Sequence, residues 1–197
     1  MSKRIVIPLS AATGLVAATA VFAAAQAATC AASTTCPTTV QFSVNAGALT
    51  INVPDGPLLL GNANAGTTIS NSFTGAGGTV VTVSDLRAVI NPTWTASVIA
   101  GAGGFTTGAG TAAETIDNVN ALYLSGNATT LPATGTSTAG QPVPPGTPVT
   151  LDVSRTAFSH TGGNGNNITA WDPTISINVP AQAVAGTYSG SINHSVA

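Results

Sequence analysis

Apolar and polar residues alternate along most of the chain from about residue 38 onward. A period of two places every second side chain on one face of an extended strand, which predicts β-strands with one buried face. The last stretch shows this most clearly, because Tyr188, Ile192, His194 and Val196 share one face. The strands predicted in this way are 38–44, 48–53, 67–73, 79–85, 94–100, 119–124, 149–153, 174–179 and 187–196.

Turns and loops complete the predicted fold. Residues 45–47 (Asn-Ala-Gly) predict a hairpin turn between the first two strands, since the glycine tolerates a positive φ. The glycine-rich stretch 101–110 and the stretch 125–148, which ends in four prolines, predict loops. Neither loop is long enough to separate two domains. We therefore predict an all-β chain that forms a single antiparallel β-sandwich of about eight to ten short strands over residues 28–197.

The N-terminus has the features of a secretory signal peptide. Lys3 and Arg4 precede a long uncharged apolar stretch, which ends in Ala-Gln-Ala. This pattern predicts a signal peptide over residues 1–27, with cleavage between Ala27 and Ala28. The alternative is a membrane anchor, although a proline, a serine and a glycine interrupt the apolar stretch. Under the first interpretation the mature chain is secreted and has no membrane span.

The chain has two cysteines, Cys30 and Cys36, and both follow the predicted cleavage site. Export places them in an oxidising compartment, where a disulfide between them would close a small loop. A metal or redox pair would need a C-x-x-C spacing or further ligands, and neither is present in the sequence.

Charged residues are scarce. The 197 residues include 4 Lys and Arg and 6 Asp and Glu, or 5% of the chain, against about 25% in an ordinary soluble domain. After the predicted signal only Arg87 and Arg155 remain as cations. Two cations cannot neutralise a run of phosphates, so the sequence excludes nucleic acid as a partner. No cofactor is expected either.

Several short segments match known functional motifs but lack the surrounding sequence features that those motifs require. Leu131–Gly135 reads LPATG, the sequence that sortases join to peptidoglycan, but predicted strands follow it instead of an apolar span and a basic tail. Residues 108–113 imitate a dinucleotide-binding turn without a βαβ unit around it. Glu114, Asp117 and two nearby asparagines offer oxygen ligands for Ca²⁺, but their spacing matches no calcium loop.

Histidine-based hydrolysis is the main catalytic possibility in the sequence. His160 and His194 could meet a serine and an aspartate in the folded chain, but no G-x-S-x-G motif is present. A single histidine in a strand is more often packed or solvated than catalytic. The sequence therefore predicts no catalytic residues.

Two longer segments resemble a known family. One is TVVTVSDLRAVINPTWTASV (79–98), and the other is ISINVPAQAVAGTYSGSINHSV (175–196), which contains a GTYSG-type ending. Together with GALTINVP (47–54), they resemble the WxL-domain surface proteins of Gram-positive bacteria, especially the high-GC relatives. The residues that carry this resemblance are Asp85, Arg87, Trp94, Tyr188 and His194. Ala96 stands where the family has the leucine of its name, and the second segment has no tryptophan.

The resemblance implies an exported all-β domain held non-covalently on the cell wall through peptidoglycan. We therefore expect a secreted, non-enzymatic surface protein that binds peptidoglycan, another wall glycan or envelope partner proteins. Two alternatives remain open: a self-assembling fibre or coat subunit that pairs through its sheet edges, and a secreted carbohydrate-active enzyme.

The residues also have a structural interpretation that needs no ligand. Asp85 and Arg87 lie two apart on one predicted strand, so they face the same side and can form an ion pair. Trp94 is one of few aromatic residues in the chain, and we expect it to pack in the core.

Overall fold

The computed structural model describes residues 29–197. The predicted signal peptide (1–27) and its cleavage site between Ala27 and Ala28 lie outside these residues. The chain divides into two compact units, Met1–Val44 and Asn45–Ala197, which we treat separately. Within the described residues, no helix has the length and apolar character that a membrane crossing requires.

In the first unit, Cys30 and Cys36 are joined at disulfide distance, with their Cα atoms 5.8 Å apart, as predicted. The predicted strand over residues 38–44 is wrong, because these residues form no secondary structure. Val40, Phe42 and Val44 are 81%, 82% and 76% exposed. Period-two alternation makes a segment suitable for a sheet but supplies no neighbouring strand to pair with it.

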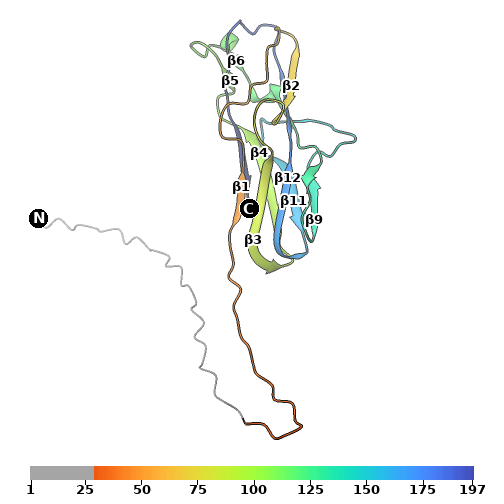
Figure 1. Cartoon of the computed structure of the whole chain (residues 1–197). Coiled ribbons are helices and arrows are strands. Elements are labelled where there is room, and N and C mark those ends of the chain that lie inside the picture. The colour runs from red at the N-terminus through yellow and green to blue at the C-terminus, as the bar shows by residue number, and fades with distance from the viewer. Residues whose placement is uncertain (1–28) are drawn as a thin grey trace, which may run out of the picture. The chain divides into compact units, whose positions relative to one another are not determined.

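The second unit is all-β, which confirms the predicted fold class. The described residues form fourteen strands, more than predicted, because several have only two to four residues. Two single-turn 3₁₀ helices, η1 (Ala112–Glu114) and η2 (Asn118–Asn120), are the helical segments of this part of the chain (Figure 1). The strands are β1 (Leu49–Asn52), β2 (Thr68–Ser72), β3 (Val81–Ile90), β4 (Thr93–Ala100), β5 (Phe105–Thr106), β6 (Thr115–Ile116), β7 (Ala121–Leu124), β8 (Ala128–Thr130), β9 (Thr136–Ala139), β10 (Val149–Thr150), β11 (Arg155–Thr161), β12 (Asn164–Trp171), β13 (Thr174–Asn178) and β14 (Ile192–Val196).

These strands form three four-stranded antiparallel sheets and one small ribbon. The orders are β1-β3-β12-β8 in the first sheet, β10-β7-β13-β2 in the second and β14-β4-β11-β9 in the third, while β5 pairs with β6. The consecutive strands β3 and β4, and likewise β11 and β12, lie one in the first sheet and the other in the third. Each connection therefore crosses from one sheet to the other, and the two turns lie at the same end of the domain (Figure 1).

The core lies between the layers. Phe158 of β11 stacks on Trp171 of β12, with ring centroids 4.7 Å apart, and Trp171 donates a hydrogen bond from Nε1 to the hydroxyl of Tyr123 in β7. All three side chains are almost completely buried. One aromatic cluster thus joins all three sheets, because each residue comes from a different sheet.

The structure corrects five further local predictions. The predicted loop 125–148 contains β8 and β9, and the loop 101–110 contains β5, which pairs with β6. The predicted strand 149–153 shortens to β10, because residues 151–153 bend away from the extended conformation, with Leu151 fully buried. The predicted strand 187–196 retains only β14, with Ser189 in an isolated bridge to Thr106. The turn predicted at 45–47 is not a hairpin turn, because β1 pairs with β3.

Two of the longer strands, β11 and β12, are also absent from the sequence prediction. In β11 the adjacent residues Ala157 and Phe158 are both buried, because a register shift against β4 interrupts the alternation. In β12 the inward-facing positions include Asn167 and Thr169, so an apolar pattern is missing. Both strands nevertheless have neighbours on both sides in their sheets.

Candidate functional site

Asp85 and Arg87 of β3 form the predicted ion pair. Arg87 donates from Nε to Oδ1 and from Nη2 to Oδ2 of Asp85, both at 2.8 Å, and its Nη2 also donates to the carbonyl of Thr93 at 2.9 Å. Asp85 is fully buried, whereas the Arg87 side chain is 32% exposed. The hydrogen bonds from Arg87 lower the pKa of Asp85 against the opposing effect of burial, and the carboxylate raises the pKa of Arg87. The pair therefore braces the turn between β3 and β4, just before Trp94.

Trp94 is buried, as predicted, and its neighbour across the sheet is His160 of β11. The two rings stack with centroids 5.6 Å apart and an interplanar angle of 13°. His160 Nε2 lies 3.1 Å from the carbonyl oxygen of Gly162, which can only accept, so Nε2 carries the proton. Nδ1 then accepts a hydrogen bond from the Ser137 hydroxyl at 3.0 Å.

This serine–histidine contact is the arrangement that hydrolases use to activate a nucleophile. Here the second ring nitrogen faces a backbone carbonyl instead of a carboxylate, and Arg87 already occupies both carboxylate oxygens of Asp85. His160 is also buried, at 1% exposure. Ser137, which lies in the stretch predicted as a loop, could not be found from sequence because its contact depends on the pairing of β9 with β11.

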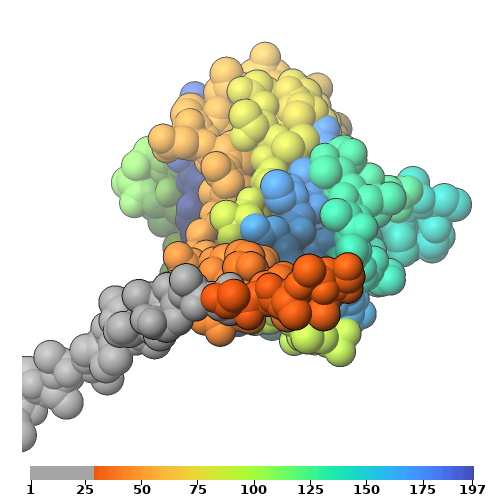
Figure 2. Space-filling model, turned by 60° about the horizontal axis from the view of Figure 1, so that its bottom comes forward, coloured from red at the N-terminus to blue at the C-terminus, as the bar shows by residue number. Residues whose placement is uncertain are grey.

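The LPATG segment, Leu131–Gly135, forms the bend between β8 and β9. Thr134 donates from its backbone N–H to Asn167 Oδ1 and from its hydroxyl to the carbonyl of Asn164. Gly135 has a φ of +78°, and a Cβ added there would lie 2.5 Å from the carbonyl oxygen of Gly162. The segment is therefore packed against the β11–β12 turn. Figure 2 views this end of the domain, where the teal β8–β9 region borders the blue strands.

Tyr188 and His194, the other two motif residues, lie in a different region of the domain. The Tyr123 hydroxyl, which accepts from Trp171 Nε1, lies at hydrogen-bond distance, 3.2 Å, from His194 Nε2. Burial lowers the pKa of His194 to about 4, so the ring is neutral near pH 7. Tyr188 donates its hydroxyl to the carbonyl of Val184. The five motif residues therefore do not form one site.

Tyr188 and His194 both line a large apolar groove with a volume of about 1170 Å³. One side is residues 53–65, an irregular segment between β1 and β2 that we call the strap, and the other is residues 183–192. Core side chains form the floor of the groove: Ile69, Phe73, Ile116, Ile175 and Ile177. The groove is somewhat larger than the usual range of small-molecule sites, and its lining is mostly apolar.

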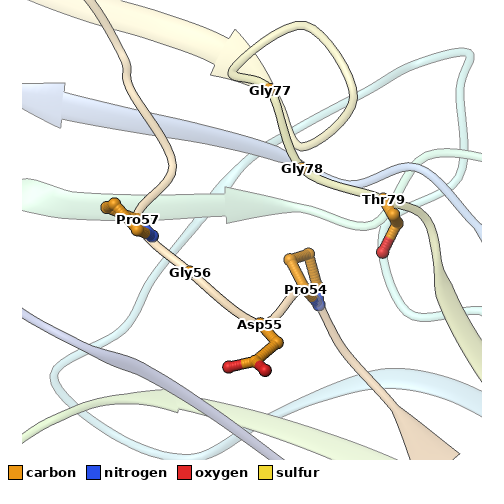
Figure 3. Close-up of a pocket in the computed structure, with 7 residues that line it drawn as sticks. All are labelled: Pro54, Asp55, Gly56, Pro57, Gly77, Gly78 and Thr79. Carbon is orange, nitrogen blue, oxygen red and sulfur yellow. The ribbon is translucent and has the colours of Figure 1, made fainter.

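A smaller pocket of about 250 Å³ lies beside the strap, between residues 54–57 and 77–79. Its lining is mainly proline rings and glycine backbone, and the carboxylate of Asp55 points away from Gly77 and Gly78 (Figure 3). The pocket is below the usual size range of small-molecule sites. It presents no charged group toward its opposite wall.

The strands β2 and β13 present a polar outer surface. Thr68 donates to Asn178 Oδ1 at 2.7 Å, and Ser70 lies 2.8 Å from Ser176, in each case directly across the strand pair. We call this surface the hydroxyl face; it consists of Thr68, Ser70, Ser72, Thr174, Ser176 and Asn178. The intervening Ile69, Ile175 and Ile177 point into the core. The same alternation that predicted these strands indicates the face, although sequence reasoning did not single it out.

The oxygen ligands considered for Ca²⁺ in the sequence make other contacts in the fold. Glu114 Oε2 accepts from the backbone N–H and the hydroxyl of Thr111, and Asn118 donates to the carbonyl of Gly101. Among residues 29–197, no three His, Cys, Asp or Glu side chains are grouped closely enough to hold a metal ion.

Comparison with known proteins finds no matching family model, no matching curated protein and no matching solved structure.

Proposed function

We propose that this chain is a secreted, non-enzymatic surface protein that associates non-covalently with the cell wall, through peptidoglycan or through envelope partner proteins. The hydroxyl face is the contact surface in this proposal. It rests on the hydroxyl face itself: two strands present a row of hydroxyls and amides in a fixed register. Wall glycans carry hydroxyl and N-acetyl groups that pair with such donors and acceptors.

The folded position of the LPATG segment supports non-covalent attachment. Cleavage between Thr134 and Gly135 would cut the bend whose hydrogen bonds reach Asn164 and Asn167. It would also separate β9 to β14 from the rest of the domain and expose the apolar side chains that they cover. A sortase linkage at this segment would therefore destroy the domain that it attaches.

The scarcity of charge predicts how the attachment responds to salt. The mature chain has two arginines against six acidic residues, so it gains little Coulombic attraction to anionic wall polymers. Hydrogen bonding by the hydroxyl face is only weakly screened by salt. We expect washed walls to release the protein into concentrated denaturant but not into concentrated salt.

The test is a pull-down of the mature protein with purified peptidoglycan, using Ser70→Glu against Thr50→Glu. Thr50 is an exposed outward residue of β1, so both variants place one carboxylate on an outer sheet surface. Binding lost in Ser70→Glu and kept in Thr50→Glu supports the proposal. Equal binding by both variants would contradict the hydroxyl face as the contact surface. Release from walls only by muramidase digestion would contradict non-covalent attachment. Soluble sugar released from the peptidoglycan by the protein would contradict a non-enzymatic function.

A further inference from the structure

The strand β14 is held in its sheet from one side. It is the edge strand in the order β14-β4-β11-β9, so within the described residues its backbone forms a ladder with β4 alone. β1 lies beside it but pairs with β3. An edge strand with a single partner has fewer backbone hydrogen bonds to break than a central strand, so it can separate while the rest of the domain stays folded.

His194 is the polar residue on the inward side of β14. It lies between Ile192 and Val196, which both pack against the core. Its ring meets Phe73 edge-on, with centroids 5.9 Å apart, and the centroid of the Tyr123 ring is 5.6 Å away. His194 Nε2 lies 3.2 Å from the Tyr123 hydroxyl oxygen. The one polar side chain that anchors β14 is therefore surrounded by aromatic rings.

These surroundings are suited to a neutral imidazole. β4 and β1 have no titratable side chain, and β7 contributes Tyr123, which burial keeps neutral by raising its pKa. Both carboxylate oxygens of Asp172 accept hydrogen bonds from Thr74. The described residues that line the groove include no Asp, Glu, Lys or Arg, and Tyr188 is the titratable residue there besides His194. No counter-ion is therefore placed to balance a proton on His194.

A proton on His194 also disturbs the hydrogen bonds of Tyr123. Both nitrogens of an imidazolium are donors, so Nε2 can then only donate to the Tyr123 hydroxyl oxygen. That oxygen already accepts from Trp171 Nε1, and the hydroxyl proton of the fully buried Tyr123 is left without an acceptor. A buried donor without an acceptor and a buried charge without a counter-ion are both unfavourable. Separation of β14 relieves both, because it moves His194 into water.

We propose that His194 is an acid-sensitive switch: protonation of its ring releases β14 from β4 while the remainder of the domain stays folded. The stacked pair Phe158 and Trp171 lies on β11 and β12, so this part of the core does not depend on β14. Release exposes the edge of β4 and opens the groove at the wall formed by Ile192 and His194. This switch does not depend on the proposed attachment to the cell wall.

The test measures amide hydrogen exchange of the mature protein by mass spectrometry between pH 7 and pH 4, corrected for the intrinsic pH dependence of amide exchange. Burial lowers the pKa of His194 from 6.5 to about 4, and exposure reverses this shift. The opening equilibrium of β14 should therefore rise by roughly a hundredfold as the pH falls from 7 to 4. Peptides from β12 and β13 should keep their protection over the same range.

Two substitutions locate the cause. His194→Gln keeps a hydrogen-bonding side chain that cannot be protonated in this range, so its β14 should stay protected at pH 4. His160→Gln removes the other histidine of the chain, which stacks on Trp94, and should leave the acid release of β14 intact. Thermal melting at pH 7 checks that each variant is folded.

Three results would overturn the proposal. The first is a native β14 with the same corrected protection at pH 7 and pH 4. The second is an equal loss of protection in β12, β13 and β14, which would mean that acid unfolds the whole domain. The third is an acid release that persists in His194→Gln or disappears in His160→Gln. The first two are measured on the native chain and need no variant, and none of them bears on wall attachment because no wall material is present.

Discussion

Replacing Arg87 with methionine tests whether the buried carboxylate of Asp85 depends on its ion pair. The substitution removes three side-chain hydrogen bonds, two to Asp85 and one to the carbonyl of Thr93. Asp85 then retains a single hydrogen bond, at 3.2 Å from the backbone N–H of residue 87, in a fully buried position. Leaving one partner of a buried pair without the other costs about 3–5 kcal/mol, so we expect the free energy of unfolding to fall by this amount.

The assay is urea unfolding followed by tryptophan fluorescence, because Trp94 and Trp171 are both buried and report the loss of the core. Arg155→Met is the matched control. Arg155 pairs with Asp152 at 3.7 Å, where both side chains are more than one-third exposed, and it also donates to the carbonyl and the hydroxyl of Thr150. Removing these contacts leaves no buried charge without a partner, and exposed pairs contribute about 0–1 kcal/mol, so the control should lose clearly less than Arg87→Met.

The pH dependence of the free energy of unfolding tests independently whether the Asp85–Arg87 ion pair causes the loss of stability. Arg87 lowers the pKa of Asp85, so the pair stabilises the fold at neutral pH, and this contribution is lost as the pH falls through the carboxyl range. The difference in free energy of unfolding between the native protein and Arg87→Met should therefore become smaller as the pH falls. A loss below about 1 kcal/mol at neutral pH, the value of an exposed pair, would refute this reasoning, as would a difference that does not change with pH.

Three further predictions concern other parts of the chain. Trp94→Ala should lower the free energy of unfolding by about 3–5 kcal/mol, the cost of emptying a buried aromatic site; an unchanged urea midpoint would contradict core packing. Burial lowers the pKa of His194 from 6.5 to about 4, so the native protein should lose about 2–3 kcal/mol as the pH falls through this range, with no change above it. His194→Gln should remove that dependence in urea titrations at each pH, and a variant that keeps it would locate the cause elsewhere. Intact-mass analysis of secreted protein should show a chain that begins at Ala28 with a Cys30–Cys36 disulfide, and two free thiols or retained residues 1–27 would contradict it.

The all-β class and the positions of most strands follow from the sequence alone. Alternation is a local property of an extended chain, so it marks β2, β4 and β13 without knowledge of their neighbours. Local geometry also predicts the Asp85–Arg87 pair, because residues two apart on a strand face the same side. Burial of Trp94 follows because so few aromatic residues are available to fill the core.

Polar strands and short strands cannot be recognised from the alternation of apolar and polar residues. β12 has Asn167 and Thr169 at buried positions, where tertiary neighbours supply hydrogen bonds to Asn167 Oδ1 and to the Thr169 hydroxyl. β8 and β9 have three and four residues, so neither is long enough to show a period. Their extended conformation is decided by the strands β12 and β11 on which they pair.

Strand partners are decided only in the folded chain. Residues 38–44 have the alternation of a strand, yet β1 pairs with β3, thirty or more residues away, and that segment lies outside the sheets. The groove likewise combines the strap, β13 and residues 183–192, which are far apart in sequence. Backbone hydrogen bonds between strands are non-local and nearly independent of side chain, so the sequence marks which segments can pair, and packing of the whole domain selects which of them do.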